Sequence, residues 1–224
     1  QMQQITYNEY LPSLGIELPI YDGFDETIDP RISNEFATLA FRMGHSQITE
    51  QTLRLNDIYH EHWSGHRNLS EGFWDPSEMI NTGGIGPTLR GAAWAVQAAN
   101  DIYTVHDLRN SMFGEPGFGG MDMCAIDIQR GRDHGIPDYG AFRTLVGLEP
   151  ANNWSDVTSD SELASRLESV YPNVSSADPL IGMYAEDHDW THYFPEYEEN
   201  RTIHSTVGPT MHYIIREQFH RLRV

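Results

Sequence analysis

The sequence is poor in cysteine, in basic residues and in long apolar runs. Cys124 is the only cysteine, so no disulfide can close within the chain, and its apolar neighbours favour a buried, inert thiol. No stretch approaches the roughly 20 apolar residues that a membrane-spanning helix needs, so no membrane span is expected. Lys and Arg number 14 against 33 Asp and Glu, which gives a formal net charge of −19. Because that field repels phosphate backbones, nucleic acid is a poor candidate partner.

The sequence does contain enough apolar material for a folded core. Hydrophobic residues make up 39% of the chain and aromatic residues 11%, which argues against wholesale disorder. One domain is the default for 224 residues. The chain opens with Gln1-Met2-Gln3-Gln4 rather than with a signal peptide, and we expect it to be a segment of a longer precursor.

Four Asn-x-Ser/Thr glycosylation acceptors lie in polar stretches rich in turn-forming residues. They are Asn68, Asn153, Asn173 and Asn200. A single acceptor often arises by chance, whereas four in one chain favour a secreted glycoprotein with these side chains at the surface.

The pattern predicts a mainly α-helical fold with little or no sheet, because Gly and Pro separate helix-like segments and strand-like alternation is scarce. Residues 151–200 are acidic and read as surface. The predicted helices are 33–48 with Ser33 as the N-cap, an Ala-rich segment from Pro87 to Ala99, 107–113, 121–134 with Gly135 as the C-cap, 161–171, and a last helix from Pro209.

His45 lies on the first of these predicted helices, in one row with Ala37 and Phe41. Ala40 and Gly44 form the adjacent row and leave space beside it for something flat. A neutral imidazole on a buried helix face can ligate iron when its other ring nitrogen donates to a fixed acceptor. A histidine on an apolar stripe is more often an ordinary core residue, so both interpretations stay open.

The helix that ends at His134 carries Asp127, Arg130 and His134 at spacings that place them on one face. On so apolar a helix, Asp127 and Arg130 either pair with each other or bind a buried group. The simpler alternative is an intrahelical Asp127–Arg130 ion pair, with His134 favoured by the helix dipole.

Several long motifs then occur in one order along nearly the whole chain. They are QITYNEYLP at 4–12, AFRMGHS at 40–46, GGIGPTLRG at 83–91, DLRN at 107–110, IQRGRDHGIP at 128–137, VGP at 207–209 and EQFHRLR at 217–223. Together they resemble the animal haem peroxidase family, the enzymes of the myeloperoxidase and peroxidasin type. The resemblance implies the family's helical fold, with residues 1–224 as the proximal, C-terminal part of a haem peroxidase domain.

Carried over position by position, the resemblance implies a haem b, or a covalently modified derivative, with His45 as the axial iron ligand. Arg42 and Arg130 would hold the haem propionates by pairing guanidinium with carboxylate. Three apolar residues align with positions that touch the macrocycle, although all three suit an ordinary core equally well. These are Phe113, Met121 and Ile126.

One departure from the family concerns Asp127, which stands where the better-known members have an asparagine that accepts the proximal histidine's ring proton. A carboxylate is a stronger acceptor, so Asp127 would push His45 towards imidazolate and lower the Fe(III)/Fe(II) potential. If Asp127 turns to Arg130 instead, this tuning of the iron is lost.

A second departure is that the family's distal histidine, distal arginine, calcium loop and haem-esterifying carboxylates all lie upstream of the segment where this chain begins. Calcium is expected in the family, but its ligands cannot be mapped here. We therefore expect a companion N-terminal chain or segment. Ile5, Leu11, Ile214, Ile215 and Phe219 would then lack partners within this chain, which predicts a large exposed apolar surface around the haem-facing helices.

The activity implied is that of a secreted peroxidase, which uses hydrogen peroxide to oxidise a small reducing substrate or a halide. One alternative is a catalytically inactive peroxidase-homology module that acts in adhesion or assembly. Another is a dioxygenase-type haem protein, although IQRGRDHG resembles the peroxidase branch more closely. A separate zinc site at His60, Glu61, His62 and His66 has the right ligand types but lacks an evident fourth ligand.

Overall fold

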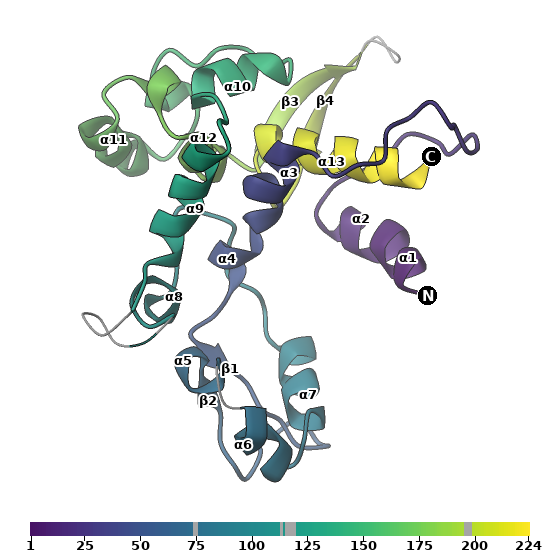
Figure 1. Ribbon diagram of the computed structural model, residues 1–224, viewed down its shortest axis with the longest axis vertical. Coiled ribbons are helices and arrows are strands. Elements are labelled where there is room, and N and C mark those ends of the chain that lie inside the picture. Colours follow the sequence, from purple (N-terminus) through teal and green to yellow (C-terminus); the bar gives the residue numbers. More distant parts are fainter. Residues whose placement is uncertain (74–75, 113, 115–119, 195–198) are drawn as a thin grey trace. The chain divides into compact units, whose positions relative to one another are not determined.

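The computed structural model describes residues 1–73, 76–112, 114, 120–194 and 199–224 (Figure 1). The chain is mainly helical, and the expected fold class is confirmed. It divides into two compact units. Unit 1 contains Gln1–Met43, Asn100–Ile102 and Asp127–Val224, and unit 2 contains Gly44–Ala99 and Tyr103–Ile126.

Unit 1 contains the longest helices, except for the first residues of one helix that begins in unit 2. It also contains the longer of the two antiparallel strand pairs found among the described residues. Its opening helical segment has a π-helical middle, η1. The elements are α1 (Met2–Ile5), η1 (Thr6–Tyr10), α2 (Leu11–Ser13), α3 (Asn34–Thr38), η2 (Ala40–Arg42), α10 (Tyr139–Leu145), η3 (Trp154–Asp156), α11 (Ser161–Val170), η4 (Val174–Ser176), α12 (Pro179–Ala185), β3 (Asp189–Phe194), β4 (Glu199–His204) and α13 (Pro209–Arg223).

Unit 2 is built from short elements joined by turns. Helix α9 (Met123–Asp133) begins in this unit and continues into unit 1. The other elements are α4 (Gly44–Gln47), β1 (Gln51–Thr52), β2 (Arg67–Asn68), α5 (Leu69–Gly72), α6 (Pro76–Asn81), α7 (Gly86–Trp94) and α8 (His106–Asn110).

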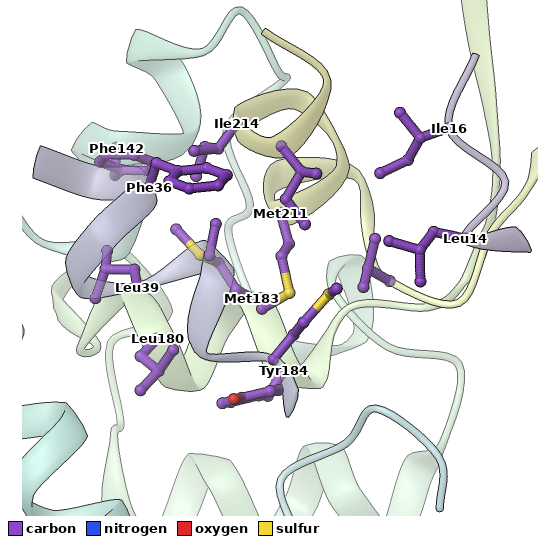
Figure 2. Packing of buried hydrophobic residues seen from close by; sticks show 14 of the residues in the cluster. Leu14, Ile16, Phe36, Leu39, Phe142, Leu180, Met183, Tyr184, Met211 and Ile214 are labelled. Carbon is purple, nitrogen blue, oxygen red and sulfur yellow. The ribbon is translucent and has the colours of Figure 1, made fainter. Parts of the chain in front are cut away.

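The main core of unit 1 forms where α12 and α13 pack against the α3–η2 segment and the end of the N-terminal helix. Met183 and Met211 lie in the middle of this cluster, and Phe36 and Leu39 come from the α3 side (Figure 2). Flexible methionine side chains fill irregular gaps between helices well. The core therefore fixes the position of the α3–η2 segment, which leads to Arg42.

A second apolar cluster joins α10, η3, α11 and α12 around Tyr139, Trp154 and Val174. Between the two clusters lies the buried carboxylate of Glu186, at the end of α12. It accepts hydrogen bonds from the Tyr139 hydroxyl at 2.8 Å, from Arg143 Nη1 at 2.8 Å and from the Thr210 backbone N–H at 2.8 Å. Burial raises the pKa of Glu186, although the donors oppose that shift.

The strand pair β3–β4 begins within residues 151–200, which the sequence predicted as acidic surface without strands. The strands pair antiparallel, with Trp190 opposite Ile203 and Thr191 opposite Thr202. The Trp190 ring meets the His212 ring edge to face at a centroid distance of 5.1 Å, which packs the hairpin against α13. Figure 1 shows the two strands as a hairpin beside α13.

The single helix predicted over 33–48 is wrong, although its start is right. The Ser33 side chain caps α3 by accepting from the Phe36 N–H, but Leu39 leaves the helical region at φ −125° and ψ −76°. Because the chain continues as η2 and α4, Ala37, Phe41 and His45 do not form the predicted row. Ala40 is fully buried rather than beside a gap, whereas the space next to Gly44 is open.

The other predicted helices are confirmed with small shifts in their ends, except for the Ala-rich one. That helix, α7, begins near Pro87 as expected but ends at Trp94, so residues 95–99 are not helical. Gly135, at φ +67°, follows α9 as the predicted C-cap. The 107–113 prediction corresponds to α8, and its last residue, Phe113, lies outside the described residues.

The prediction that five apolar residues lack partners within this chain is wrong for most of them. Leu11, Ile214 and Ile215 are buried in the main core, Phe219 packs against it, and Ile5 is 46% exposed. Unit 2 does expose a set of large apolar side chains, each more than half accessible. They are Ile58, Trp63, Ile80, Ile85, Leu89, Trp94 and Val96.

Among the described residues, no helix is both long and apolar enough to cross a membrane. Nor does any group of three or more His, Cys, Asp or Glu in that part of the chain gather closely enough to hold a metal ion. His62 Nδ1 lies 2.8 Å from Ser64 Oγ, and His66 Nδ1 accepts from the Arg54 N–H, so these rings have other partners than zinc. Cys124 is half-buried rather than buried, and its thiol lies 2.9 Å from Thr104 Oγ1.

Candidate haem-binding site

Helix α9 runs antiparallel to the 34–42 segment within unit 1 and touches it at three levels. At its C-terminal end the Asn34 side chain donates to the His134 carbonyl at 3.0 Å, and Asn34 Oδ1 lies 2.8 Å from His134 Nδ1. One turn back, Gly131 lies so close to Leu39 that an added Cβ would come within 3.1 Å of the Leu39 side chain. These contacts place the buried face of α9, which carries Gly131 and Asp127, against the segment that carries Arg42.

The third level is an ion pair between Arg42 and Asp127. Arg42 Nη1 donates to Asp127 Oδ1, and the side chains are 23% and 3% exposed. Asp127 and Gly131 are four residues apart, so they share one face of α9. Tyr184 supports the same segment, because its hydroxyl donates to the Arg42 carbonyl at 2.9 Å. The structure therefore gives Asp127 a partner that neither sequence alternative considered.

Arg42 keeps part of its hydrogen-bonding capacity unused. Its Nε atom is buried and has no hydrogen-bond partner among the described residues. A guanidinium group presents five N–H donors in a planar fork, and Nε–H and Nη2–H point along one shared edge. The described residues thus fill Nη1 and leave the buried Nε–H without an acceptor.

Arg130 lies on the exposed side of α9, and its side chain forms no ion pair with a described residue. The intrahelical Asp127–Arg130 pair is therefore absent from the described part of the chain, and that alternative is wrong. Arg130 remains an accessible cation one turn from Asp127 on the helix.

His45 lies in unit 2, on the short helix α4. Its side chain is half-buried, the following Ser46 is 5% exposed, and the open space at Gly44 lies directly before it in the chain. The acceptor role of Asp127 towards His45 stays a prediction, as does the ligand role of His45 itself.

The three apolar candidates have different surroundings. Met121 is 48% exposed and Ile126, near the start of α9, is half-buried, so neither is a fully buried core residue. Phe113 lies outside the described residues. Contact of these side chains with a macrocycle remains a prediction.

The α3–η2 segment is also held from the other side by α13. Gln218 is fully buried; its Oε1 accepts from the Ser33 N–H at 2.7 Å, and its Nε2 donates to the Arg31 carbonyl at 3.4 Å. The Phe219 ring meets Phe36 and Phe41 edge to face, at 5.8 and 5.9 Å. Gln218 and Phe219, which belong to the motif EQFHRLR, thus position the start of the segment that contains Arg42.

A family model described as animal haem peroxidase matches residues 1–224. The chain belongs to the animal haem peroxidase family. In this haem peroxidase chain, the ion pair of Arg42 and Asp127 joins the motif AFRMGHS to the residue that directly precedes the motif IQRGRDHGIP.

Relatives of this haem peroxidase chain include Peroxinectin A of Dictyostelium discoideum, which is 39% identical over 223 residues, covering 100% of this chain and 39% of that protein. Lactoperoxidase of Mesocricetus auratus is 35% identical over 99% of this chain and 31% of its own length. Among solved structures, Peroxidase A from Dictyostelium discoideum matches with a TM-score of 0.87 and 37% identity, covering 99% of this chain and 40% of that one. The chain thus spans about two fifths or less of the length of each of these three proteins.

Sequence reasoning nominated Arg42, Asp127 and Arg130 but missed the residues that position them. Gly131, Leu39, Asn34 and Tyr184 were not singled out. A signal for Gly131 was present in the sequence, because it lies four residues after Asp127 and a glycine inside a helix often marks a close approach. The contacts of Tyr184 and Asn34 join distant parts of the chain and have no local pattern.

Proposed function

We propose that residues 1–224 form the proximal part of a haem peroxidase domain that uses hydrogen peroxide to oxidise a small reducing substrate or a halide. Membership of the family and its peroxidase relatives support this proposal. When bound, haem would supply an iron centre that peroxide oxidises by two electrons and that the reducing substrate reduces again.

The main observation behind the proposal is the hydrogen bonding of Arg42. This arginine is tied to a buried carboxylate through one nitrogen, while its buried Nε has no partner among the described residues. A buried donor without a hydrogen-bond partner lowers stability by about 1–3 kcal/mol. Such a group therefore favours an acceptor that comes from outside the chain. A haem propionate has the charge and the two oxygens to fill that edge, and the exposed Arg130 is suited to the second propionate.

In this proposal the imidazole of His45 would hold the haem iron, and Asp127 would be the acidic residue that tunes it. Met121, Ile126 and Phe113 are proposed to line the macrocycle. The haem is haem b or a covalently modified derivative.

We propose that a companion segment supplies what this chain does not show. A peroxidase needs a base to move a proton between the peroxide oxygens and a positive group to stabilise the departing one. This chain spans 39% of Peroxinectin A and 40% of Peroxidase A, so the matched proteins contain much that lies outside it. The calcium site of the family would also belong to that companion segment.

We also propose that the protein is secreted and glycosylated. Asn68, Asn153, Asn173 and Asn200 are all exposed, as the sequence predicted, which an oligosaccharide requires. Expression in a eukaryotic secretory host should give a mass excess that enzymatic removal of N-glycans abolishes. A protein of unmodified mass from that host would contradict the proposal of glycosylation.

The experiment that tests the function is a haemin titration of the purified chain, followed by addition of hydrogen peroxide. We expect a stoichiometric complex with a Soret band that moves when peroxide is added. Oxidation of a phenolic reductant should be slow if the companion segment supplies the distal groups. A Soret absorption that stays that of free haemin throughout the titration would contradict the proposal and favour an inactive peroxidase-homology module.

A further inference from the structure

Unit 2 contains a pocket of about 260 Å³ between the end of α4, strand β1 and the C-terminal end of α7. We infer that this pocket binds a small, uncharged aromatic molecule that carries a hydroxyl or amide group, such as an aromatic alcohol. The inference goes beyond the proposed function, because none of the candidate haem-binding residues that the structure describes lines the pocket.

The pocket exists because α7 ends early. Ala95 adopts extended backbone, with ψ 137°, so the chain leaves the helix after Trp94. Val96 and Gln97 then form part of one wall of the pocket. In the unbroken helix that the sequence predicted, the chain would continue along the axis of α7 instead.

Two contacts hold the walls of the pocket together. The Ala98 N–H donates to the Gln47 carbonyl at 3.1 Å, which joins the segment after α7 to α4. At Gly91, an added Cβ would come within 1.9 Å of the Leu53 carbonyl oxygen, so α7 lies directly against the residue that follows β1. Walls joined by backbone contacts keep their spacing, and a pocket formed in advance lowers the entropy that binding costs.

The residues that line the pocket favour a neutral ligand. Ile48, Leu53 and Val96 supply apolar surface, and the polar side chains of the lining are those of threonine and glutamine. Such hydroxyl and amide groups donate and accept hydrogen bonds without carrying a charge. An anion would find no cation in this lining and would be repelled by the net charge of −19. A cation would lose its hydration without gaining a carboxylate partner.

The volume of the pocket limits the size of the ligand. An apolar cavity of roughly 150 Å³ holds a benzene ring, and drug-sized ligands occupy roughly 300–1,000 Å³. A pocket of about 260 Å³ therefore suits one or two fused rings. Its rim supports the same choice, because Val96 is 87% exposed and Ala92 is also exposed, so a flat ring would cover apolar surface that water contacts.

The test is a titration of the full chain with 2-naphthol, followed by the anisotropy of the naphthol fluorescence. We expect saturable binding at one site. Naphthalene-2-sulfonate has the same rings and a negative charge, so it should bind more weakly by about tenfold or more. Equal binding of the two compounds would overturn the inference. So would the absence of saturable 2-naphthol binding, which would leave the pocket as a packing surface for a protein segment.

Two adjacent alanines of α7 provide a matched comparison. Ala92 and Ala93 are both exposed, but only Ala92 lines the pocket. Ala92→Phe should fill the pocket and weaken 2-naphthol binding by about tenfold or more, whereas Ala93→Phe should change it by less than about twofold. Circular dichroism should show the same helix content in both variants. An equal effect of the two substitutions on binding would contradict the assignment of the site.

A second pair of variants separates this site from general adsorption to the exposed apolar side chains of unit 2. Val96 lines the pocket, whereas Ile58, which is 70% exposed, does not. Val96→Asp should weaken 2-naphthol binding by about tenfold or more, because the ligand would desolvate the new charge, and Ile58→Asp should leave binding unchanged. Weakening of the same size in both would indicate adsorption and overturn the inference. The titration contains no haem, so its outcome and that of the haemin titration are independent.

Discussion

The ion pair between Arg42 Nη1 and Asp127 Oδ1 joins residues that are 85 positions apart in the sequence. It connects the motif that contains His45 with the residue directly before the motif that contains Arg130. Around it, α9 is held to the α3–η2 segment by Gly131 and by the Asn34–His134 contact. Arg42 and Asp127 are therefore held by packing on several sides rather than by one loop.

Replacement of Gln218 by Ala should loosen the start of this segment. The buried Gln218 amide satisfies the Ser33 N–H and the Arg31 carbonyl, and its loss leaves both groups unpaired. We expect the free energy of unfolding to fall by about 1–3 kcal/mol, measured by urea denaturation. Gln3→Ala, at an exposed position of α1, is the control and should change it by less than about 0.5 kcal/mol. An equal effect of both substitutions would show that α13 does not anchor the segment.

Gly182→Ala should destabilise the packing of α12 against α10. A Cβ at this position would lie 2.2 Å from a ring atom of Tyr139, which is fully buried and bonded to Glu186. Overpacking of this kind lowers the free energy of unfolding by about 1–3 kcal/mol, which outweighs the better helix propensity of Ala. At Gly72, on α5, no described atom lies within 4 Å of the added Cβ, so Gly72→Ala should be close to neutral. A melting temperature of Gly182→Ala at or above that of the unmodified chain would refute this account of the contact.

Asp178→Asn should remove a pH-dependent contribution to stability. Arg132 donates to both carboxylate oxygens, at 2.8 and 2.7 Å, and the Tyr171 hydroxyl donates at 2.7 Å; these donors, Arg132 foremost, lower the pKa of Asp178 below its usual value of 3.8. Because the unfolded state then binds more protons than the folded state, the stabilisation is present above about pH 4 and disappears as the pH falls through the lowered pKa. Arg132 is more than half exposed, so the contribution should be about 1 kcal/mol or less.

The measurement is a series of urea denaturations of both proteins between about pH 2 and pH 7. The difference in unfolding free energy should be constant near neutral pH and close towards zero at the acid end. A difference that does not depend on pH would contradict this assignment of the Asp178 charge.

The sequence predicted the elements whose ends are set by local chemistry. Gly135 ends α9, Ser33 starts α3, and Pro209 starts α13, because caps and proline act through their immediate neighbours. The break at Leu39 has no such signal. It depends on Gly131 packing against Leu39 and on the 4.6 Å stacking of Phe36 on Phe41, which an unbroken helix would place about 140° apart.

The same distinction separates the parts of the site that were foreseen from those that were not. The sequence indicated Arg42 and Asp127 as candidates, but their pairing depends on how α9 meets the η2 segment, which no local pattern encodes. The β3–β4 pair was not predicted, because the acidic composition and the glycosylation acceptor of this segment indicate surface, whereas Trp190, Thr191 and Ile203 favour strands.

The most direct test of the account is the absorption spectrum of His45→Ala after titration with haemin. We predict that this variant loses the iron ligand and most haem occupancy, while circular dichroism shows its helices intact, since Ala favours helix. His60→Ala, an exposed histidine of the same unit, should keep the spectrum of the unmodified chain. A His45→Ala protein that binds haemin with an unchanged five-coordinate spectrum would show that His45 is not the axial ligand.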